Sequence, residues 1–258
     1  MKFIFVLLLV LLGFSDLFAQ ELSLSTSATY GRYSQSQQRD KIISESLHIA
    51  YTPSLNDGLG LSLNHSSLSR IALSDIAGNT ANLSYYHFFT NSRGNHIGGK
   101  AALHHISSDD PNSDGTTIPH LSISYKPASL LSAFEIGLTH TPYTDATAQQ
   151  VSAMVAMALF DQEVWSQTRV TYITLSSPIQ KKNNTVAVEE RLSYYVVPDE
   201  ITLSFYALFG ERIYAYDVDL GTAYNLPDIQ KGSLGVSLNY NLEDEMRLFV
   251  DITQEQYY

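Results

Sequence analysis

Asp110, Asn112 and Asp114 have the spacing of the first ligands of a calcium-binding loop. Together with the proline, serine and glycine between and after them they match the pattern D-x-N-x-D-G. A complete loop of this kind has a bidentate Glu at its twelfth position, and Leu121 stands there instead. The proline and the glycine also suit a plain turn. The segment is therefore a weak calcium candidate, and an acidic surface loop is the alternative that we favour.

Glu45, His65 and Ser67 form a second group that could carry chemistry. A hairpin that turns around Pro53–Asp57 pairs Glu45 with His65 across two neighbouring strands. Ser67 follows two residues later, so the period of a strand places it on the same face as His65. By the alternation of apolar residues this is the apolar, lipid-facing side, close to one end of the strands.

The segment Asn64-His65-Ser66-Ser67 resembles the His-x-Ser signature of outer-membrane lipid hydrolases, the phospholipase and lipid A deacylase barrels. The resemblance implies that Ser67 is the nucleophile, that His65 is the base and that Glu45 orients it. Leu68 follows Ser67 where those families carry Asn. A polar strand end at the level of the lipid headgroups is the structural alternative, and we favour it.

Charged residues on the polar face of the predicted strands form a third group. A charge on a membrane strand is tolerated when it faces away from lipid. These residues would set the selectivity of a polar conduit, or would neutralise one another inside a filled interior. They are Lys100, Lys126, Glu135, Arg169, Glu189, Arg191, Asp217, Asp219, Arg247 and Asp251.

Strands position these groups. They are predicted from the alternation of apolar and polar residues, with a period of two, that runs through most of the chain after residue 20. Leu234, Val236 and Leu238, for example, alternate with serine, glycine and asparagine. The predicted strands cover approximately 22–33, 42–52, 58–69, 80–90, 96–106, 118–126, 133–143, 150–160, 163–175, 184–196, 200–210, 214–225, 232–242 and 245–258. Most are long enough to cross a bilayer at a tilt.

These strands predict an all-β protein: a transmembrane, antiparallel up-and-down β-barrel of about 14 strands, with 12–16 possible. The polar face carries mostly Gly, Ser, Thr and Asn, which suits a water-filled lumen better than the outside of a soluble sandwich. Short connections alternate with several longer polar ones, as in outer-membrane barrels. Fourteen strands would put both termini on the periplasmic side, and no long loop stands out as a plug.

Composition excludes several other classes. The 258 residues include 15 basic and 26 acidic residues, which give a net charge of -11 and argue against nucleic-acid binding. The absence of cysteine excludes disulfide scaffolds, thiol catalysis and a lipid-modified cysteine anchor. No cofactor is expected. The protein is therefore expected to act as a barrel in the outer-membrane lipid.

The N-terminus has the pattern of a secretory signal peptide. A lysine at position 2 is followed by the apolar run Phe3–Leu12, and Ala19 offers a small residue for cleavage. We therefore divide the chain into a signal peptide, 1–19, and an outer-membrane β-barrel domain, 20–258. The chain would cross the inner membrane and end in the outer membrane.

Aromatic residues on the apolar face gather at predicted strand ends, as in the interfacial girdles of membrane barrels. They include Tyr51, Phe89, Tyr125, Phe134, Tyr194, Tyr224 and Tyr258 near one end, and Tyr30, Phe209 and Tyr240 near other strand ends. The final Tyr258 resembles the last residue of outer-membrane barrels, which implies recognition of the C-terminal strand by the barrel-assembly machinery. The preceding glutamines, Gln254 and Gln256, depart from that pattern. From about Phe134 onward, strands such as Val188–Tyr195 resemble the YaiO-like outer-membrane barrel family.

Three functions follow from this interpretation. The first is porin-like passage or export of a small polar solute or glycan through the lumen. The second is lipid hydrolysis at His65 and Ser67. The third is a structural barrel with a filled lumen. We regard an enzyme as the less favoured of these readings.

Overall fold

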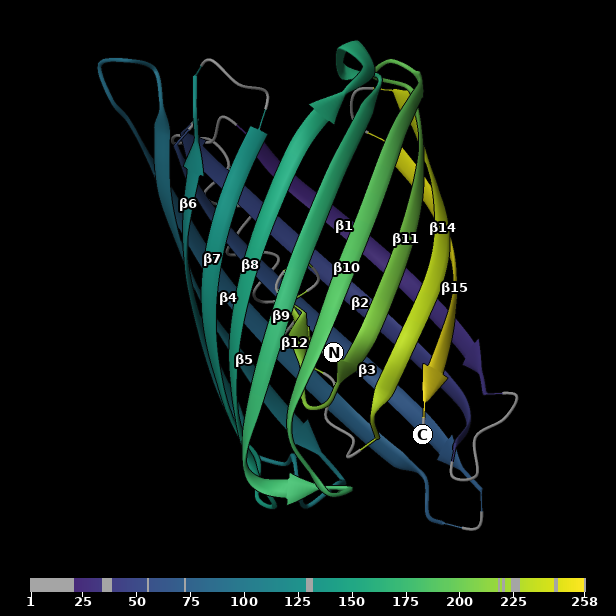
Figure 1. Ribbon diagram of the computed structural model, residues 1–258. Helices are drawn as coiled ribbons and strands as arrows, with labels where there is room; N and C mark the ends of the chain where they lie inside the picture. The colour runs from purple at the N-terminus through teal and green to yellow at the C-terminus, as the bar shows by residue number, and fades with distance from the viewer. Residues whose placement is uncertain are drawn as a thin grey trace.

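The computed structural model describes residues 21–33, 39–54, 56–71, 73–128, 132–217, 219, 221–223, 228–243 and 246–257. The described chain is built from strands and one short 3-10 helix, which confirms the predicted all-β class (Figure 1). The elements are β1 (Glu21–Arg32), β2 (Arg39–Ser54), β3 (Asp57–Arg70), β4 (Ile76–Thr90), β5 (His96–Ser108), β6 (Thr117–Lys126), β7 (Ser132–Pro142), β8 (Thr147–Leu159), η1 (Phe160–Gln162), β9 (Val164–Ile179), β10 (Lys182–Val197), β11 (Ile201–Arg212), β12 (Tyr216–Asp217), β13 (Thr222–Ala223), β14 (Gln230–Glu243) and β15 (Met246–Tyr257). None of the described residues forms a helix long and apolar enough to cross a membrane.

Thirteen strands form one antiparallel sheet in the order β1 to β11, then β14 and β15, and the sheet curls into a barrel. The connections 54–57, 90–96, 126–132, 159–164, 197–201 and 243–246 lie at one end, which we call the turn end. The connections 32–39, 70–76, 108–117, 142–147, 179–182 and 212–230 lie at the other end, which we call the loop end and which is at the bottom of Figure 1.

The strand predicted over 214–225 is not a membrane strand, and this changes the topology. The described residues of that segment form only the two-residue strands β12 and β13, which pair with each other and not with the main sheet. Thirteen strands put the start of β1 at the turn end and the end of β15 at the loop end, so the described strands do not begin and end on one side as expected.

β1 and β15 consequently run in the same direction and come together at the loop end. There the guanidinium of Arg39 lies 5.3 Å from the ring centre of Tyr33 and 4.3 Å from that of Tyr257. Among the described residues, no backbone pairing joins β1 to β15. The cluster therefore links the connection after β1 and the start of β2 to the end of β15.

The register of the strands confirms the predicted two-sided pattern. Leu47 lies opposite Leu63 and Glu45 opposite His65, as the hairpin around residues 53–57 requires. Large apolar side chains stand exposed on the outside of the barrel, among them Leu121, Val170, Phe205, Leu234 and Ile252. Exposed apolar surface of this extent is stable only in lipid, because water would drive it into contact with other apolar surface.

Aromatic side chains lie exposed near both ends of the strands. Phe89, Tyr125 and Phe134 are exposed near the turn end, and Tyr30 and Phe209 near the loop end. This is the girdle arrangement of membrane barrels. Tyr224 and Tyr258 lie outside the described residues.

Glu190 points outward from the middle of β10, between two outward-facing apolar residues. Its pairing with Thr168 on β9 and Ala207 on β11 continues without a bulge. A local shift in register therefore does not turn it inward. Its carboxylate instead accepts hydrogen bonds from Ser166 Oγ at 2.8 Å and Thr168 Oγ1 at 2.5 Å.

Candidate functional site in the lumen

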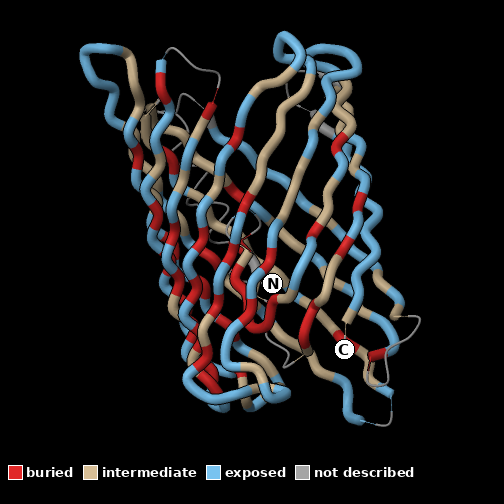
Figure 2. Tube along the Cα trace, in the orientation of Figure 1, coloured by how far each residue is buried: buried red, intermediate tan, exposed pale blue. Residues whose placement is uncertain are grey.

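The connection between β11 and β14 folds back into the barrel. We call its described residues within 213–229 the lumen hairpin; it contains β12 and β13. Buried positions are concentrated toward the loop end, at the bottom of Figure 2, where this segment meets the barrel wall. No long loop stands out in the sequence as a plug, yet this connection enters the lumen.

The base of the lumen hairpin is held by apolar packing. Ile213, Tyr214 and Ile229 are each at most 2% exposed, and they join a cluster with inward-facing residues of the wall. The wall contributes Ile106, Ile118, Ala148, Ile173 and Leu175. Burial of this size contributes roughly 1.5–3 kcal/mol for each large side chain. The base is thus a small core inside the barrel.

Polar contacts tie the same base to two loops. The Tyr214 hydroxyl donates to Asp145 Oδ2 at 2.5 Å and accepts from Asn112 Nδ2 at 2.9 Å. Tyr143 packs edge-on against the Tyr214 ring, with 4.6 Å between the ring centres. Burial, and then the neighbouring Tyr214 and the carboxylates, raises the pKa of the Tyr143 phenol well above its usual value.

Tyr216 anchors the middle of the lumen hairpin against the wall. Its ring lies 5.8 Å from that of His104 and 5.7 Å from that of His120, centre to centre. Its hydroxyl donates to Asn82 Oδ1 at 3.0 Å. The Gln150 amide donates to its backbone carbonyl and accepts from its backbone N–H, at 2.9 and 3.0 Å. Contacts from four strands therefore fix this one residue.

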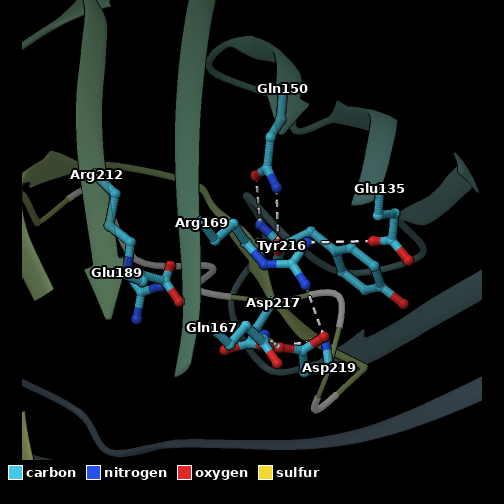
Figure 3. Close-up of polar contacts among 9 residues, drawn as sticks. All are labelled: Glu135, Gln150, Gln167, Arg169, Glu189, Arg212, Tyr216, Asp217 and Asp219. Carbon is cyan, nitrogen blue, oxygen red and sulfur yellow. Dashed lines mark hydrogen bonds and ion pairs between the residues drawn. The ribbon is translucent and has the colours of Figure 1, made fainter. Parts of the chain in front are cut away.

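Ion pairs hold the tip of the lumen hairpin (Figure 3). Arg169, which is buried on β9, contacts Asp219 at 2.8 Å and Glu135 of β7 at 3.3 Å. Gln167 donates to the other oxygen of Asp219 at 3.0 Å. Arg212, just before the hairpin, pairs with Glu189 of β10 at 2.8 Å. Removing Glu189 would leave the buried Arg212 without its ion-pair partner, which for a buried pair typically costs about 3–5 kcal/mol.

Beside the lumen hairpin a cavity of about 2600 Å³ remains. Its wall includes Arg39 and Lys231 at the loop end and Asp199 and Asn241 at the turn end, so it extends along the whole barrel. Acidic and basic groups are nearly balanced on this wall. The described lining has the basic residues Arg32, Arg39, Lys100, Arg191, Arg212 and Lys231, and the acidic residues Glu135, Asp199, Asp217, Asp219, Asp228, Asp251 and Glu255.

Most of the charged residues assigned to the lumen lie there. Lys100, Arg191 and Asp251 line the cavity from the wall, while Glu135, Arg169 and Glu189 belong to the ion pairs. Asp217 and Asp219 also line it, but from the lumen hairpin and not from a membrane strand. Lys126 is exposed at the turn end of β6, and Arg247 lies on β15 opposite Asn241. The side chain of Arg247 is outside the described part of the chain.

The candidate calcium residues serve the fold of the β5–β6 loop. One carboxylate oxygen of Asp110 accepts from the Asn112 N–H at 3.3 Å and the other from Ser113 Oγ at 3.1 Å. Asp114 Oδ1 accepts from the Ser108 N–H at 2.9 Å. No group of three or more His, Cys, Asp or Glu side chains in the described chain could hold a metal ion. These contacts favour the plain acidic loop.

On the outside of the barrel, His65 is exposed and lies opposite Glu45 as expected, but its hydrogen-bond partner is Asn79. His65 Nδ1 lies 3.0 Å from Asn79 Oδ1 on β4. Ser67 is two residues away on the same strand and opposite Ala77. Among the described contacts no hydrogen bond joins His65 to Glu45 or to Ser67, so the roles of Glu45, His65 and Ser67 stay a prediction.

The sequence contains a signal for the lumen hairpin, which a count of alternating strands does not detect. Ile106, Ile118 and Ile173 occupy the polar, lumen-facing positions of their strands, where Ser, Thr or Gly is the rule. Apolar residues on that face at one end of several strands need an apolar partner inside the barrel.

The chain is similar to several solved barrel structures at low sequence identity. Solved structures that resemble it include a KdgM porin, with 9% identity, a TM-score of 0.46, and coverage of 74% of this chain and 91% of that one. The translocator domain of the autotransporter NalP from Neisseria meningitidis has 12% identity, a TM-score of 0.46, and coverage of 99% and 91%. BamA from Haemophilus ducreyi lacking POTRA domains 1–3 has 11% identity, a TM-score of 0.35, and coverage of 95% and 74%.

No protein-family model and no curated protein matches the sequence, so the likeness to the YaiO-like family stays a prediction. The architecture itself is decisive. Antiparallel strands long enough to cross a bilayer expose apolar side chains outward, carry aromatic rings near both ends and surround a polar lumen. The chain is an integral β-barrel protein of the outer membrane.

Proposed function

We propose that the barrel lets a small polar solute or glycan pass through its lumen, in the manner of a porin. The observation that carries this proposal is the cavity of about 2600 Å³, whose polar wall includes residues from both ends of the barrel. Eight-stranded barrels fill their interior with side chains, whereas barrels of 16–18 strands leave an aqueous channel. Thirteen strands with one inserted hairpin leave a narrowed passage between these two cases.

Ion flow through the refolded barrel tests this function. Arg191 of β10 and Asp251 of β15 both line the cavity from the wall, and no ion pair involves either of them among the described residues. Arg191→Glu should shift the selectivity of the passage toward cations, and Asp251→Lys should shift it toward anions. Glu190→Gln, on the outer face, is the control and should leave selectivity unchanged. A correctly folded barrel that carries no current would overturn the proposal.

Secretion and assembly complete this proposal. Residues 1–19 would direct export and be removed near Ala19. The mature chain would then begin close to Glu21, the first residue of β1. The C-terminal strand β15 would then be recognised by the barrel-assembly machinery. N-terminal sequencing of the protein from outer membranes checks the cleavage. Loss of β15 should leave the chain soluble or degraded, while a barrel that still inserts without β15 would contradict this role.

Lipid hydrolysis on the outer face is the second candidate, supported by the hydrogen bond between His65 and Asn79. That bond uses Nδ1 and leaves Nε2 of His65 to act as a base toward Ser67, with Asn79 in the orienting position. Release of fatty acid from outer-membrane phospholipid by the refolded protein would support it. The activity should disappear in Ser67→Ala and persist in Ser69→Ala. Equal activity of both variants, or none in the unaltered protein, would refute this candidate.

A further inference from the structure

One side of the cavity is a neutral wall formed by the lumen faces of β1–β4. Its central residues are hydroxyls and amides, with one imidazole and no charged side chain. Ser44 and Ser46 come from β2, Ser62 and Asn64 from β3, and Thr80 and Ser84 from β4. The charged residues Lys41 and Glu45 of β2 fall on the opposite, outward parity. The neutrality of this wall follows directly from the sequence of four adjacent strands.

The neutral wall is already organised by hydrogen bonds. Asn64 Nδ2 donates to Ser44 Oγ and Ser46 Oγ, each at 3.0 Å, and His48 Nδ1 lies 2.8 Å from Ser62 Oγ. A hydroxyl has one donor and two acceptor positions, so each keeps capacity for a further partner. Neighbouring strands are about 4.8 Å apart, so these groups form a dense array of donors and acceptors toward the cavity.

The other side of the cavity has charges, but the structure pairs the most buried of them. Arg169 contacts both Glu135 and Asp219, and Arg212 contacts Glu189. Neither side therefore presents a row of like charges that would replace the hydration shell of an ion. Along the neutral wall a charged solute would lose hydration without a compensating charge, which is costly. A neutral solute with many hydroxyls would exchange its bonds to water for bonds to the neutral wall.

Aromatic rings line the same cavity toward the turn end. Tyr86 and Phe88 come from β4, and Tyr195 comes from β10. Glycines make room for the first two rings, because a Cβ on Gly58 would lie 2.2 Å from the Tyr86 ring and one on Gly98 would lie 2.3 Å from the Phe88 ring. Rings of this kind offer apolar faces, and Tyr adds a polar tip. Sugar rings, with apolar C–H faces and polar edges, match this combination.

From these observations we infer that the solute is an uncharged, polyhydroxylated molecule of the saccharide class, recognised by the neutral wall and by the rings at the turn end. This inference rests on the proposed passage function and narrows its substrate class. The neutral wall is continuous, its polar groups are pre-organised, and the most buried of the charges across the cavity are paired among themselves.

Swelling of liposomes that contain the refolded barrel tests this inference with three solutes that share one ring. Glucose is neutral, glucuronate is an anion and glucosamine is a cation at neutral pH. We expect glucose to enter several-fold faster than either charged analogue. Asn64→Asp should slow glucuronate further and favour glucosamine. Ser107→Asp adds the same charge to an exposed position that faces outward from β5, and should change neither rate.

The outcomes separate the inference from the function on which it rests. Entry of glucuronate or glucosamine as fast as glucose would overturn the inference while leaving passage intact. Failure of all three solutes to enter, with a barrel shown to be folded by its heat-dependent mobility on a gel, would overturn passage and the inference together. No response to Asn64→Asp would show that the solute does not contact the neutral wall.

Discussion

A cysteine pair at positions 82 and 221 should lock the lumen hairpin to β4. A Cβ atom on Gly221 would lie 3.7 Å from the Cβ of Asn82, within the roughly 3.5–4.5 Å that a disulfide spans. The chain contains no cysteine, so no other thiol competes. We therefore expect Asn82→Cys/Gly221→Cys to oxidise readily in the membrane-inserted protein. Gel mobility with and without reductant measures the bond.

The balance of free-energy contributions favours formation of this disulfide bond. Gly221 has φ of +62°, so a cysteine there costs about 1–2 kcal/mol. Closing a loop of roughly 140 residues removes about 5 kcal/mol of conformational freedom from the unfolded chain. The oxidised barrel should therefore be more stable to denaturant by roughly 3 kcal/mol.

A control cysteine pair and the conductance of the oxidised barrel test whether the hairpin stays docked. Ala81→Cys/Gly221→Cys should not crosslink, because residue 81 has the outward parity of β4. Oxidation of the 82/221 pair should leave the conductance unchanged, since the hairpin is already docked in the structure. If the pair fails to form, or if oxidation lowers the current, the hairpin lies elsewhere in the conducting barrel and our description of the lumen is refuted.

Three further substitutions should give results of known direction. Tyr216→Ala removes the ring between His104 and His120 and should enlarge the single-channel current, with a loss of about 3–5 kcal/mol in denaturant unfolding; an unchanged current would contradict the role of Tyr216 as an anchor. Gly210→Ala should destabilise the barrel by about 2 kcal/mol or more in the same assay, because φ is +100° and the new Cβ would lie 2.4 Å from the carbonyl oxygen of Val186; a neutral effect would refute this. Glu190→Leu should stabilise the barrel in lipid by about 1 kcal/mol, because it removes a carboxylate from the lipid-facing surface; a destabilised variant would instead show that its bonds to Ser166 and Thr168 matter more.

The barrel itself could be predicted from the sequence because the physical signal is local. Alternation such as that of Leu234, Val236 and Leu238 fixes which side chains face lipid, and a slip of one residue would reverse every one of them. The same constraint gave the pairing of Leu47 with Leu63 from the hairpin alone. Register is thus determined by strand pattern and turn position, both of which are visible in the chain.

The turn between β9 and β10 was harder to predict. The predicted strands 163–175 and 184–196 imply a longer loop between them, but the strands continue to Ile179 and resume at Lys182. Gln180 and Lys181 both have positive φ, 50° and 67°, as in a type I′ turn. Neither residue is the Asn or Gly that normally marks such a turn, so the sequence lacks its usual signal.

The lumen hairpin could not be found from alternation, because its own residues alternate too. Tyr214 and Tyr216 have the spacing of a strand, and this suggested a membrane strand over 214–225. The position of this segment inside the barrel is determined by long-range contacts. These join Tyr216 to Asn82, Tyr214 to Asp145, and Asp219 to Arg169. Such contacts between distant parts of the chain leave no local period. Asn79, the partner of His65, lies directly opposite it on β4, one residue before the predicted strand 80–90 begins, so that strand boundary excluded it.

The central claim is that a polar passage runs through this barrel beside the docked hairpin. Single-channel recording of the refolded protein in a planar bilayer tests it most directly. We predict discrete current steps with weak ion selectivity, because acidic and basic groups are nearly balanced on the cavity wall. Complete silence from a correctly folded barrel would contradict the claim and would show that the lumen is filled.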